Sequence, residues 1–392
     1  MNRRLADRVQ TRLGSIDSGG TRRTLRAPSG IDLSSNDYLG LASHPRLKQA
    51  CVDAIAREGV GSTGSRLLRG HRDAFAAIED RFARFKGTER ALYFSSGYLA
   101  NLAVMTTFAE PGDVIVSDER NHASLVDGIR LSSARREIVP HNDVHAVRRA
   151  IEAGRASGAG GQTFVVVESL FSMDGDEAPL ADLAGLCTET SAHLIVDEAH
   201  AVGVYGARGS GLIEQRGIEE DVFLSINTAG KALGVSGAFV CGPAWAIEYL
   251  VQRARPFIFS TAPPPVLAAA LEASLDIVDE EPQRRTALLE HAARLRDRLR
   301  TCGVSVDRGG SHIVPVVVGG NDDAVLLAEA LQADGFDVRA IRPPTVPEGT
   351  ARLRLSVNVN LTDEIIERFV TSLVGAGLKT RPCTTQCSAG SL

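Results

Sequence analysis

The chain has 392 residues, of which 44% are hydrophobic and 23% are charged. This length can bury a large core, and we expect two domains with short appendages. The formal net charge of −5 argues against nucleic acid as the main partner, because binding to a phosphate backbone requires a broad basic surface. No run of about 18 apolar residues occurs, so we expect no membrane span.

The N-terminal segment places Leu5, Val9 and Leu13 at helical spacing but lacks an apolar core as long as that of a signal peptide. Asp7 disfavours an organelle presequence, so we expect a short N-terminal arm over residues 1–45.

The cysteines are scattered, unlike those of a disulfide framework or a zinc site, which favours the reducing cytoplasm. They are Cys51, Cys187, Cys241, Cys302, Cys383 and Cys387.

Helical and strand patterns alternate over residues 46–270, which we expect to form the large domain. Phe75, Ile78, Phe82 and Phe85 mark an amphipathic helix. Apolar runs typical of buried strands occupy 91–94, 113–116, 163–167, 194–196, 222–226 and 237–241. This alternation predicts an α/β fold, with a mainly parallel central sheet and helices on both of its faces.

After the three prolines at 263–265 the pattern changes. One long helical stretch is expected from about 266 to 301. Strand-like segments follow at 313–318, 336–342 and 352–357, with a helix near 323–334 and a last helix toward the end. This order predicts a small C-terminal α+β domain over 271–376. Residues 377–392 are rich in Thr, Ser, Gly and Pro, and we expect a disordered tail there.

The strongest chemical signal combines two short segments. In L-I-V-D-E-A-H (194–200), a buried strand ends at Asp197 and His200 follows three residues later. Open α/β sheets bind ligands beyond the carboxyl ends of their strands, which is where these two residues lie. In T-A-G-K, Thr228 and Lys231 lie a helical turn apart. A lysine for an imine, an anion for a pyridine nitrogen and small groups for a phosphate are what pyridoxal phosphate (PLP) requires, so these residues predict a PLP site.

Other classes of protein fit less well. D-E-A-H is also typical of nucleotide hydrolases, but these need an upstream G-x-x-x-x-G-K-[ST] loop, which the sequence lacks. A metal site at Asp197 and His200 would need H-E-x-x-H or C-x-x-C ligands, and neither occurs, so we expect no metal. A dinucleotide-dependent oxidoreductase is disfavoured because G-A-R-G-S-G at 206–211 has the wrong glycine spacing.

Eight sequence blocks, which run in order over about residues 20–375, resemble the α-oxoamine synthases. They are S-S-N-D-Y-L-G-L (34–41), G-S-T-G-S-R (61–66), S-S-G-Y-L-A-N (95–101), N-H-A-S-L-V-D-G (121–128), F-S-M-D-G-D-E-A-P-L (171–180), V-D-E-A-H-A-V-G-V-Y-G (196–206), T-A-G-K-A-L-G (228–234) and R-P-P-T-V-P-E-G-T-A-R-L-R-L (342–355). Any one block would be a weak signal, but together they are specific. The resemblance implies the aspartate-aminotransferase type of PLP fold (fold type I) and a homodimer whose active sites lie at the subunit interface.

The resemblance also implies roles for individual residues. Lys231 would hold PLP as an imine and act as a base, Asp197 would keep the pyridine nitrogen protonated, and His122 would stack on the ring and polarise a thioester carbonyl. His200 and Ser172 would share a polar network at the phenolic oxygen, although Ser172 could instead cap a turn. The groups expected at the phosphate are Gly97, Tyr98, Thr228 and, toward the partner subunit, Ser260 and Thr261.

Substrate contacts follow from the same resemblance. Arg354 would clamp the amino-acid carboxylate. The other expected contacts are Arg22, Asn36, His122, Arg342 and Thr345. Arg22, Arg342 and Thr345 could otherwise be ordinary surface residues, Asn36 could cap a turn, and His122 could be a core histidine with satisfied hydrogen bonds.

Within this resemblance, R-P-P-T-V-P at 342–347 implies the branch of the family that condenses L-alanine with a pimeloyl thioester in biotin synthesis. Coenzyme A and an acyl carrier protein both remain possible as the acyl carrier. Sister branches that use glycine with acetyl-CoA, or serine with a long acyl-CoA, remain alternatives, as does an inactive PLP-binding protein.

Overall fold

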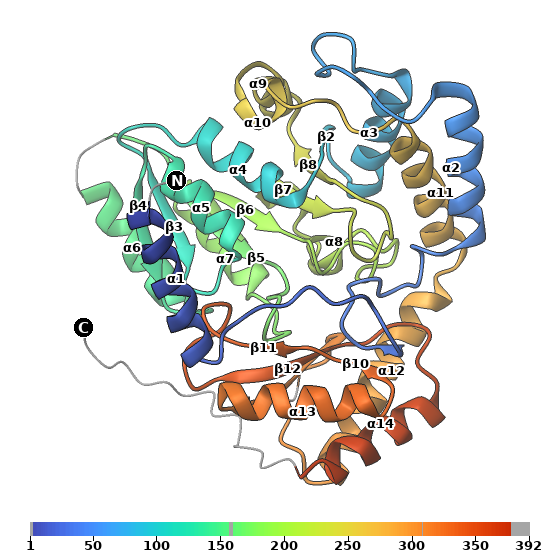
Figure 1. Ribbon diagram of the computed structural model, residues 1–392. Helices are drawn as coiled ribbons and strands as arrows, with labels where there is room; N and C mark the ends of the chain where they lie inside the picture. Colours follow the sequence, from blue (N-terminus) through green and yellow to red (C-terminus); the bar gives the residue numbers. More distant parts are fainter. Residues whose placement is uncertain (1–2, 157–159, 308, 378–392) are drawn as a thin grey trace. The chain divides into compact units, whose positions relative to one another are not determined.

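The computed structural model describes residues 3–156, 160–307 and 309–377 (Figure 1). Contacts divide them into two compact units. The larger unit comprises Asn36–Ser172 and Asp176–Thr286, and the smaller comprises the described residues up to Ser35, Met173–Gly175 and those from Ala287 onward. Apart from Gly377, the expected tail, with Cys383 and Cys387, lies outside the described residues. No helix within the described residues is long and apolar enough to cross a membrane.

A seven-stranded sheet forms the centre of the larger unit, in the order β2-β8-β7-β6-β5-β3-β4. Its strands are β2 (Arg90–Phe94), β3 (Val114–Asp118), β4 (Arg135–Val139), β5 (Thr163–Glu168), β6 (His193–Asp197), β7 (Val222–Thr228) and β8 (Ala238–Gly242). Only β8 runs antiparallel to its neighbours within this sheet, so the prediction of a mainly parallel sheet is confirmed. The sequence did not reveal β4, because this edge strand is largely charged and exposed and carries no apolar run.

Helices cover both faces of this sheet. They are α2 (Pro45–Glu58), α3 (Asp73–Lys86), α4 (Gly97–Phe108), α5 (Ala123–Leu131), α6 (Val144–Ala156), α7 (Leu180–Glu189), α8 (Leu212–Arg216), α9 (Ala244–Arg253), α10 (Arg255–Ile258) and α11 (Val266–Glu280), with a 3₁₀ turn at Glu219–Asp221. Neighbouring residues of β8 show the two faces, because side chains alternate along a strand. Phe239 stacks on Phe82 of α3 with ring centroids 3.9 Å apart, whereas Ala238 and Val240 pack in the core cluster that includes α4.

The smaller unit is built on a three-stranded antiparallel sheet, β11-β12-β9. Its elements are α1 (Arg3–Ser18), β1 (Ile31–Asp32), β9 (Ile313–Gly319), α13 (Asn321–Ala333), β10 (Phe336–Asp337), β11 (Ala340–Ile341), β12 (Ala351–Ser356) and α14 (Asp363–Gly375), together with most of α12 (Gln283–Thr301).

Two expectations for the C-terminal part were wrong. The single helix expected over 266–301 is two helices, α11 and α12, because Pro282 lies between them and a proline ring obstructs a continuous helix. The segment 336–342 is not one strand, because the chain changes partner within it: β10 pairs with β1, and β11 pairs with β12.

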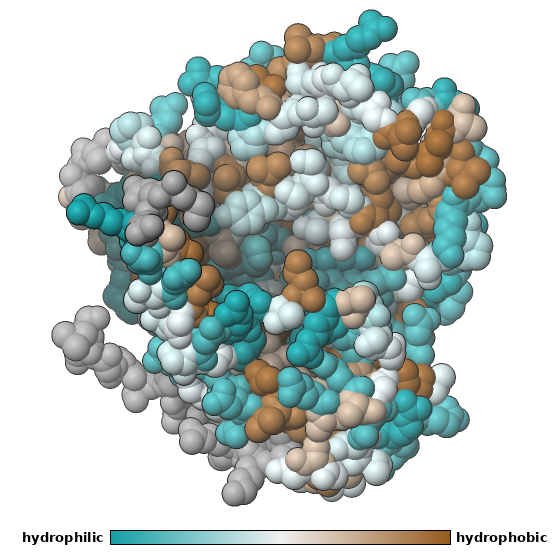
Figure 2. All heavy atoms as spheres, in the orientation of Figure 1, coloured by the Kyte–Doolittle hydropathy of each residue, from teal (hydrophilic) through white to brown (hydrophobic). Residues whose placement is uncertain are grey.

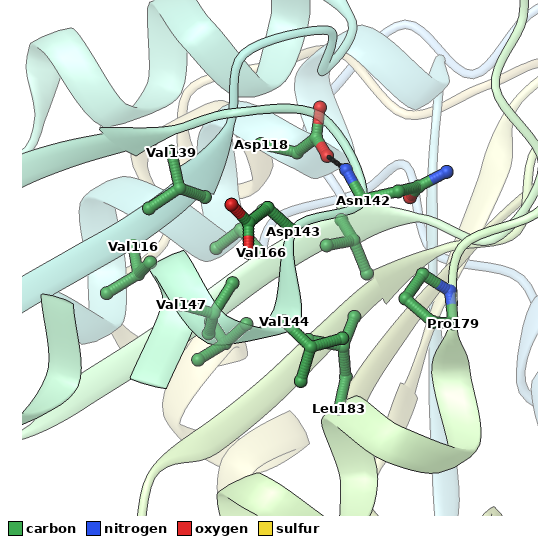
Figure 3. A pocket seen from close by; sticks show the side chains of 12 residues that line it. Val116, Asp118, Val139, Asn142, Asp143, Val144, Val147, Val166, Pro179 and Leu183 are labelled. Carbon is green, nitrogen blue, oxygen red and sulfur yellow. Dashed lines mark hydrogen bonds between the residues drawn. The ribbon is translucent and has the colours of Figure 1, made fainter. Parts of the chain in front are cut away.

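A small apolar cavity lies between the sheet and helices α6 and α7 (Figure 3). Valine side chains of β3, β4 and β5 line it, and a 2.8 Å hydrogen bond from the Asn142 N–H to Asp118 Oδ2 lies at its rim. Its volume of about 10 Å³ has room for at most about one water molecule. It is therefore a packing gap and not a ligand site.

Candidate active site

A chain of hydrogen bonds starts at Lys231, directly after β7. The Lys231 Nζ lies 2.7 Å from His200 Nε2, and His200 Nδ1 lies 2.7 Å from Tyr38 Oη. Tyr38 Oη in turn donates to Asn36 Oδ1 at 2.8 Å. Because the Tyr38 hydroxyl proton goes to Asn36, His200 Nδ1 donates to Tyr38 Oη. The buried His200 thus links Tyr38 to Lys231 and orients the amine of Lys231.

Asp197 ends β6, at the carboxyl edge of the parallel strands, where the sequence placed it. Its Oδ1 accepts the Ala199 N–H at 2.9 Å, and its Oδ2 accepts Asn101 Nδ2 at 2.7 Å. Asn101 Nδ2 also lies 2.9 Å from Ser124 Oγ. A buried carboxylate with a donor on each oxygen is fixed in orientation, as an anion that faces a pyridinium nitrogen must be.

His122 precedes α5 and caps it. Its Nδ1 lies 2.7 Å from Ser124 Oγ and accepts the Ser124 N–H at 3.2 Å. Loss of hydration lowers the pKa of His122; the charge of Asp197 opposes this effect and that of Lys231 adds to it. The ring is therefore neutral near pH 7, and because Nδ1 is an acceptor, Nε2 carries the proton.

The first turn of α4 begins beside the hydroxyl group of Thr228. Ser96 caps this helix by accepting the Leu99 N–H at 3.2 Å, and the Gly97 and Tyr98 N–H groups belong to the turn that has no intrahelical acceptors. A Cβ on Gly97 would lie 2.6 Å from Thr228 Oγ1, so a larger residue would displace the Thr228 hydroxyl group. A helix N-terminus beside a hydroxyl group suits a phosphate. With Lys231, Asp197 and His122, this turn gives a residue set that fits PLP.

The remaining predicted cofactor residues also belong to the larger unit. Ser172 is buried in the loop after β5, and its backbone N–H donates to Glu168. The Tyr98 hydroxyl donates to Asp127, which raises the pKa of Tyr98. Ser260 and Thr261 lie in the loop after α10, half-buried and exposed respectively.

Arg22, Arg342 and Thr345 line one groove of about 460 Å³ within the smaller unit. The Arg342 guanidinium donates to the backbone carbonyls of Gly20 and Arg22, and the Arg22 side chain pairs with Asp17 at 2.7 Å. Arg342 therefore holds the N-terminal segment in place within this unit. Arg354 lies on β12, is 7% exposed and donates to Ser356 Oγ at 2.6 Å.

The sequence alone assigns no role to Asn101, Ser124, Tyr38 or Glu168. Asn101 had a usable signal, because it follows Gly97 by four residues in S-S-G-Y-L-A-N and so lies on the same face of a helix. The other three are recognisable only once distant segments are brought together.

Known proteins identify the family of this chain. The model of the aminotransferase class I and II family matches residues 28–373. The 8-amino-7-oxononanoate synthase of Geobacter sulfurreducens is 44% identical over 362 residues, which are 92% of this chain and 92% of that protein. The chain belongs to the 8-amino-7-oxononanoate synthase family within the class I and II aminotransferases. The predicted fold type I architecture is thereby confirmed.

Solved structures of related enzymes share the family fold. The chain is 30% identical to the serine palmitoyltransferase of Sphingomonas wittichii, with a TM-score of 0.88 over 95% of this chain and 97% of that one. Another serine palmitoyltransferase structure, which contains PLP, is 28% identical with a TM-score of 0.88 and coverages of 96% and 98%. The 8-amino-7-oxononanoate synthase of Francisella tularensis is 30% identical, with a TM-score of 0.76 and coverages of 88% and 97%.

Proposed function

We propose that this enzyme is a PLP-dependent acyltransferase that condenses L-alanine with a pimeloyl thioester. The products are 8-amino-7-oxononanoate, CO₂ and the free thiol, and the reaction is a step of biotin synthesis. The observation that carries this proposal is the hydrogen-bonded Lys231–His200 pair, which lies in the same unit as the doubly bonded Asp197 in a chain 44% identical to an 8-amino-7-oxononanoate synthase.

When bound, PLP supplies an electron sink for the carbanion formed at Cα of the amino acid. Asp197 would keep the pyridine nitrogen protonated, with Asn101 and Ala199 fixing the orientation of its carboxylate. The first turn of α4 and Thr228 would hold the phosphate.

Two residues handle the protons. Lys231, oriented by His200, removes the proton from Cα of alanine and later returns one to the product. His122 is neutral and protonated at Nε2, so it donates a hydrogen bond to the thioester carbonyl oxygen. This bond stabilises the negative charge that develops on the carbonyl when the nucleophile attacks. The thiol then leaves, and the alanine carboxyl group is lost as CO₂.

We propose that the enzyme acts as a cytoplasmic homodimer on small-molecule substrates, with CoA or an acyl carrier protein as the acyl carrier. Clustered apolar side chains on the surface support a subunit interface, because soluble monomers rarely expose large contiguous apolar patches. Figure 2 shows hydrophobic side chains over α2, where Val52 and Ile55 are exposed. Phe259, which precedes the predicted phosphate residue Ser260, is 71% exposed.

The test is release of free thiol by the purified, PLP-loaded enzyme with three substrate pairs: pimeloyl-CoA with L-alanine, acetyl-CoA with glycine, and palmitoyl-CoA with L-serine. We expect release with the first pair and none from Lys231→Ala, the matched control. Release with only one of the other pairs would reassign the enzyme to a sister branch. The serine palmitoyltransferase structures make the third pair the specific alternative.

A further inference from the structure

Two carboxyl groups end adjacent strands beneath the candidate active site. Glu168 is the last residue of β5, Asp197 is the last residue of β6, and the two are register partners in the parallel sheet. Register partners on parallel strands direct their side chains to the same face. Glu168 is 3% exposed and Asp197 is 5% exposed, so neither charge is shielded by water.

The hydrogen bonds of the two groups differ. Each oxygen of Asp197 has a donor, from Ala199 or from Asn101. Glu168 accepts the backbone N–H groups of His122 and Ser172, but its Oε1 has no hydrogen-bond partner among the described residues. Leaving a charged oxygen buried without a donor is costly, and two like charges at close range increase the cost. A single negative charge on this face is therefore best held by Asp197.

We propose that Glu168 is a protonated, neutral carboxylic acid in the working enzyme and acts as a positioning residue for Lys231 and His122. This inference rests on the proposed function only for its catalytic consequence; the protonation itself does not depend on the substrate.

The charges around Glu168 are consistent with this state. Burial raises the pKa of Glu168 to about 8, and the charge of Asp197 on β6 adds to the effect. Lys231, after β7, and the N–H groups of His122 and Ser172 act in the opposite direction. The imidazole of His122 at the start of α5 is neutral near pH 7, so it adds no net charge.

A neutral Glu168 has consequences for the proton-transfer groups. If Glu168 were ionised beside Asp197, the second negative charge would favour the protonated form of Lys231. Lys231 could then not accept a proton from the substrate. The second charge would likewise favour the charged imidazolium of His122. The neutral group still accepts the N–H groups of His122 and Ser172, and so fixes the start of α5 relative to the Ser172 loop.

Infrared spectroscopy can detect the proton directly, in the apoenzyme and in the PLP-loaded enzyme. We expect a carboxylic-acid C=O band in wild type at pH 7 that disappears as the pH rises through about 8 and is missing in Glu168→Gln. Absence of a wild-type-minus-variant band at pH 7 would overturn the proposal. Because this measurement needs no substrate, it stands or falls independently of thiol release.

The activity profile tests the positioning role. If ionised Glu168 holds the proton on Lys231, the kcat/KM of Glu168→Gln relative to wild type should rise about tenfold between pH 7 and pH 9. A ratio that does not change with pH would refute that role.

If Glu168→Gln fails to fold, Asp197→Asn replaces it in the infrared experiment. Removing the neighbouring charge should move the loss of the band to lower pH, and an unmoved band would contradict the account.

Discussion

His141 contacts two acidic side chains in the larger unit. We expect its replacement to lower the free energy of unfolding more at low pH than at high pH. Its Nδ1 lies 3.0 Å from Asp118 Oδ1 and its Nε2 lies 2.6 Å from Asp176 Oδ2, while Phe171 packs edge-on against the ring with centroids 4.4 Å apart. Burial alone would lower the pKa of His141, but the hydrogen bonds and charges of Asp118 and Asp176 outweigh it and raise the pKa from 6.5 to about 9.

The magnitude and sign follow from this pKa difference. At about 1.4 kcal/mol per pKa unit, the protonated state of His141 contributes about 3 kcal/mol to folding stability. Because the folded state holds the proton more tightly, this contribution is fully present below pH 6.5 and is lost as the pH rises through about 9.

Guanidinium unfolding of wild type and His141→Gln at pH 6 and pH 10 measures the effect. The destabilisation caused by His141→Gln should be about 3 kcal/mol larger at pH 6 than at pH 10. His145→Gln is the matched control, because His145 is exposed on the neighbouring helix α6, and its small effect should be similar at both pH values. A destabilisation by His141→Gln that is the same at both pH values would refute the reasoning.

Two substitutions test the cofactor residues. Asn101→Leu removes the donor to Asp197 Oδ2 and should weaken PLP binding about 10- to 100-fold in equilibrium dialysis, whereas unchanged affinity would contradict the role of Asn101. Gly97→Ala introduces a Cβ 2.6 Å from Thr228 Oγ1 and should weaken PLP at least about tenfold more than pyridoxal, which lacks the phosphate. Gly185→Ala in α7 is the control, because nothing lies within 4 Å of the added Cβ, and it should change the affinity for neither PLP nor pyridoxal. If Gly97→Ala weakened the binding of PLP and pyridoxal equally, the result would contradict the phosphate site.

The strands that the sequence predicted share a physical property. The buried strands β3, β5 and β6 are nearly continuous apolar runs, because both of their faces are covered, and such runs are visible without a structure. Strand β4 forms at the edge through backbone pairing to β3, and its residues R-R-E-I-V carry almost no apolar signal. The break at Pro282 was readable from the sequence, since proline rarely continues a helix.

Some residues of the candidate site could be predicted from the sequence, and others could not. Lys231, Asp197 and His200 lie in short segments with characteristic spacing, so their types and order predicted a PLP site. Glu168 and Tyr38 could not be found in this way. The position of Glu168 beside Asp197 follows from the pairing of β5 with β6. The contact of Tyr38 with His200 joins residues 162 positions apart. Long-range pairing of this kind leaves no local pattern in the sequence.

The most direct test of the proposed reaction follows the alanine carboxyl carbon. The PLP-loaded enzyme is incubated with pimeloyl-CoA and L-alanine labelled with ¹³C at the carboxyl group, and CO₂, free CoA and the amino-keto product are measured together. We expect ¹³CO₂ and CoA in equal amounts, unlabelled 8-amino-7-oxononanoate, and none of the three from Lys231→Ala. A product that retains the label, or turnover that persists without Lys231, would contradict the proposed reaction.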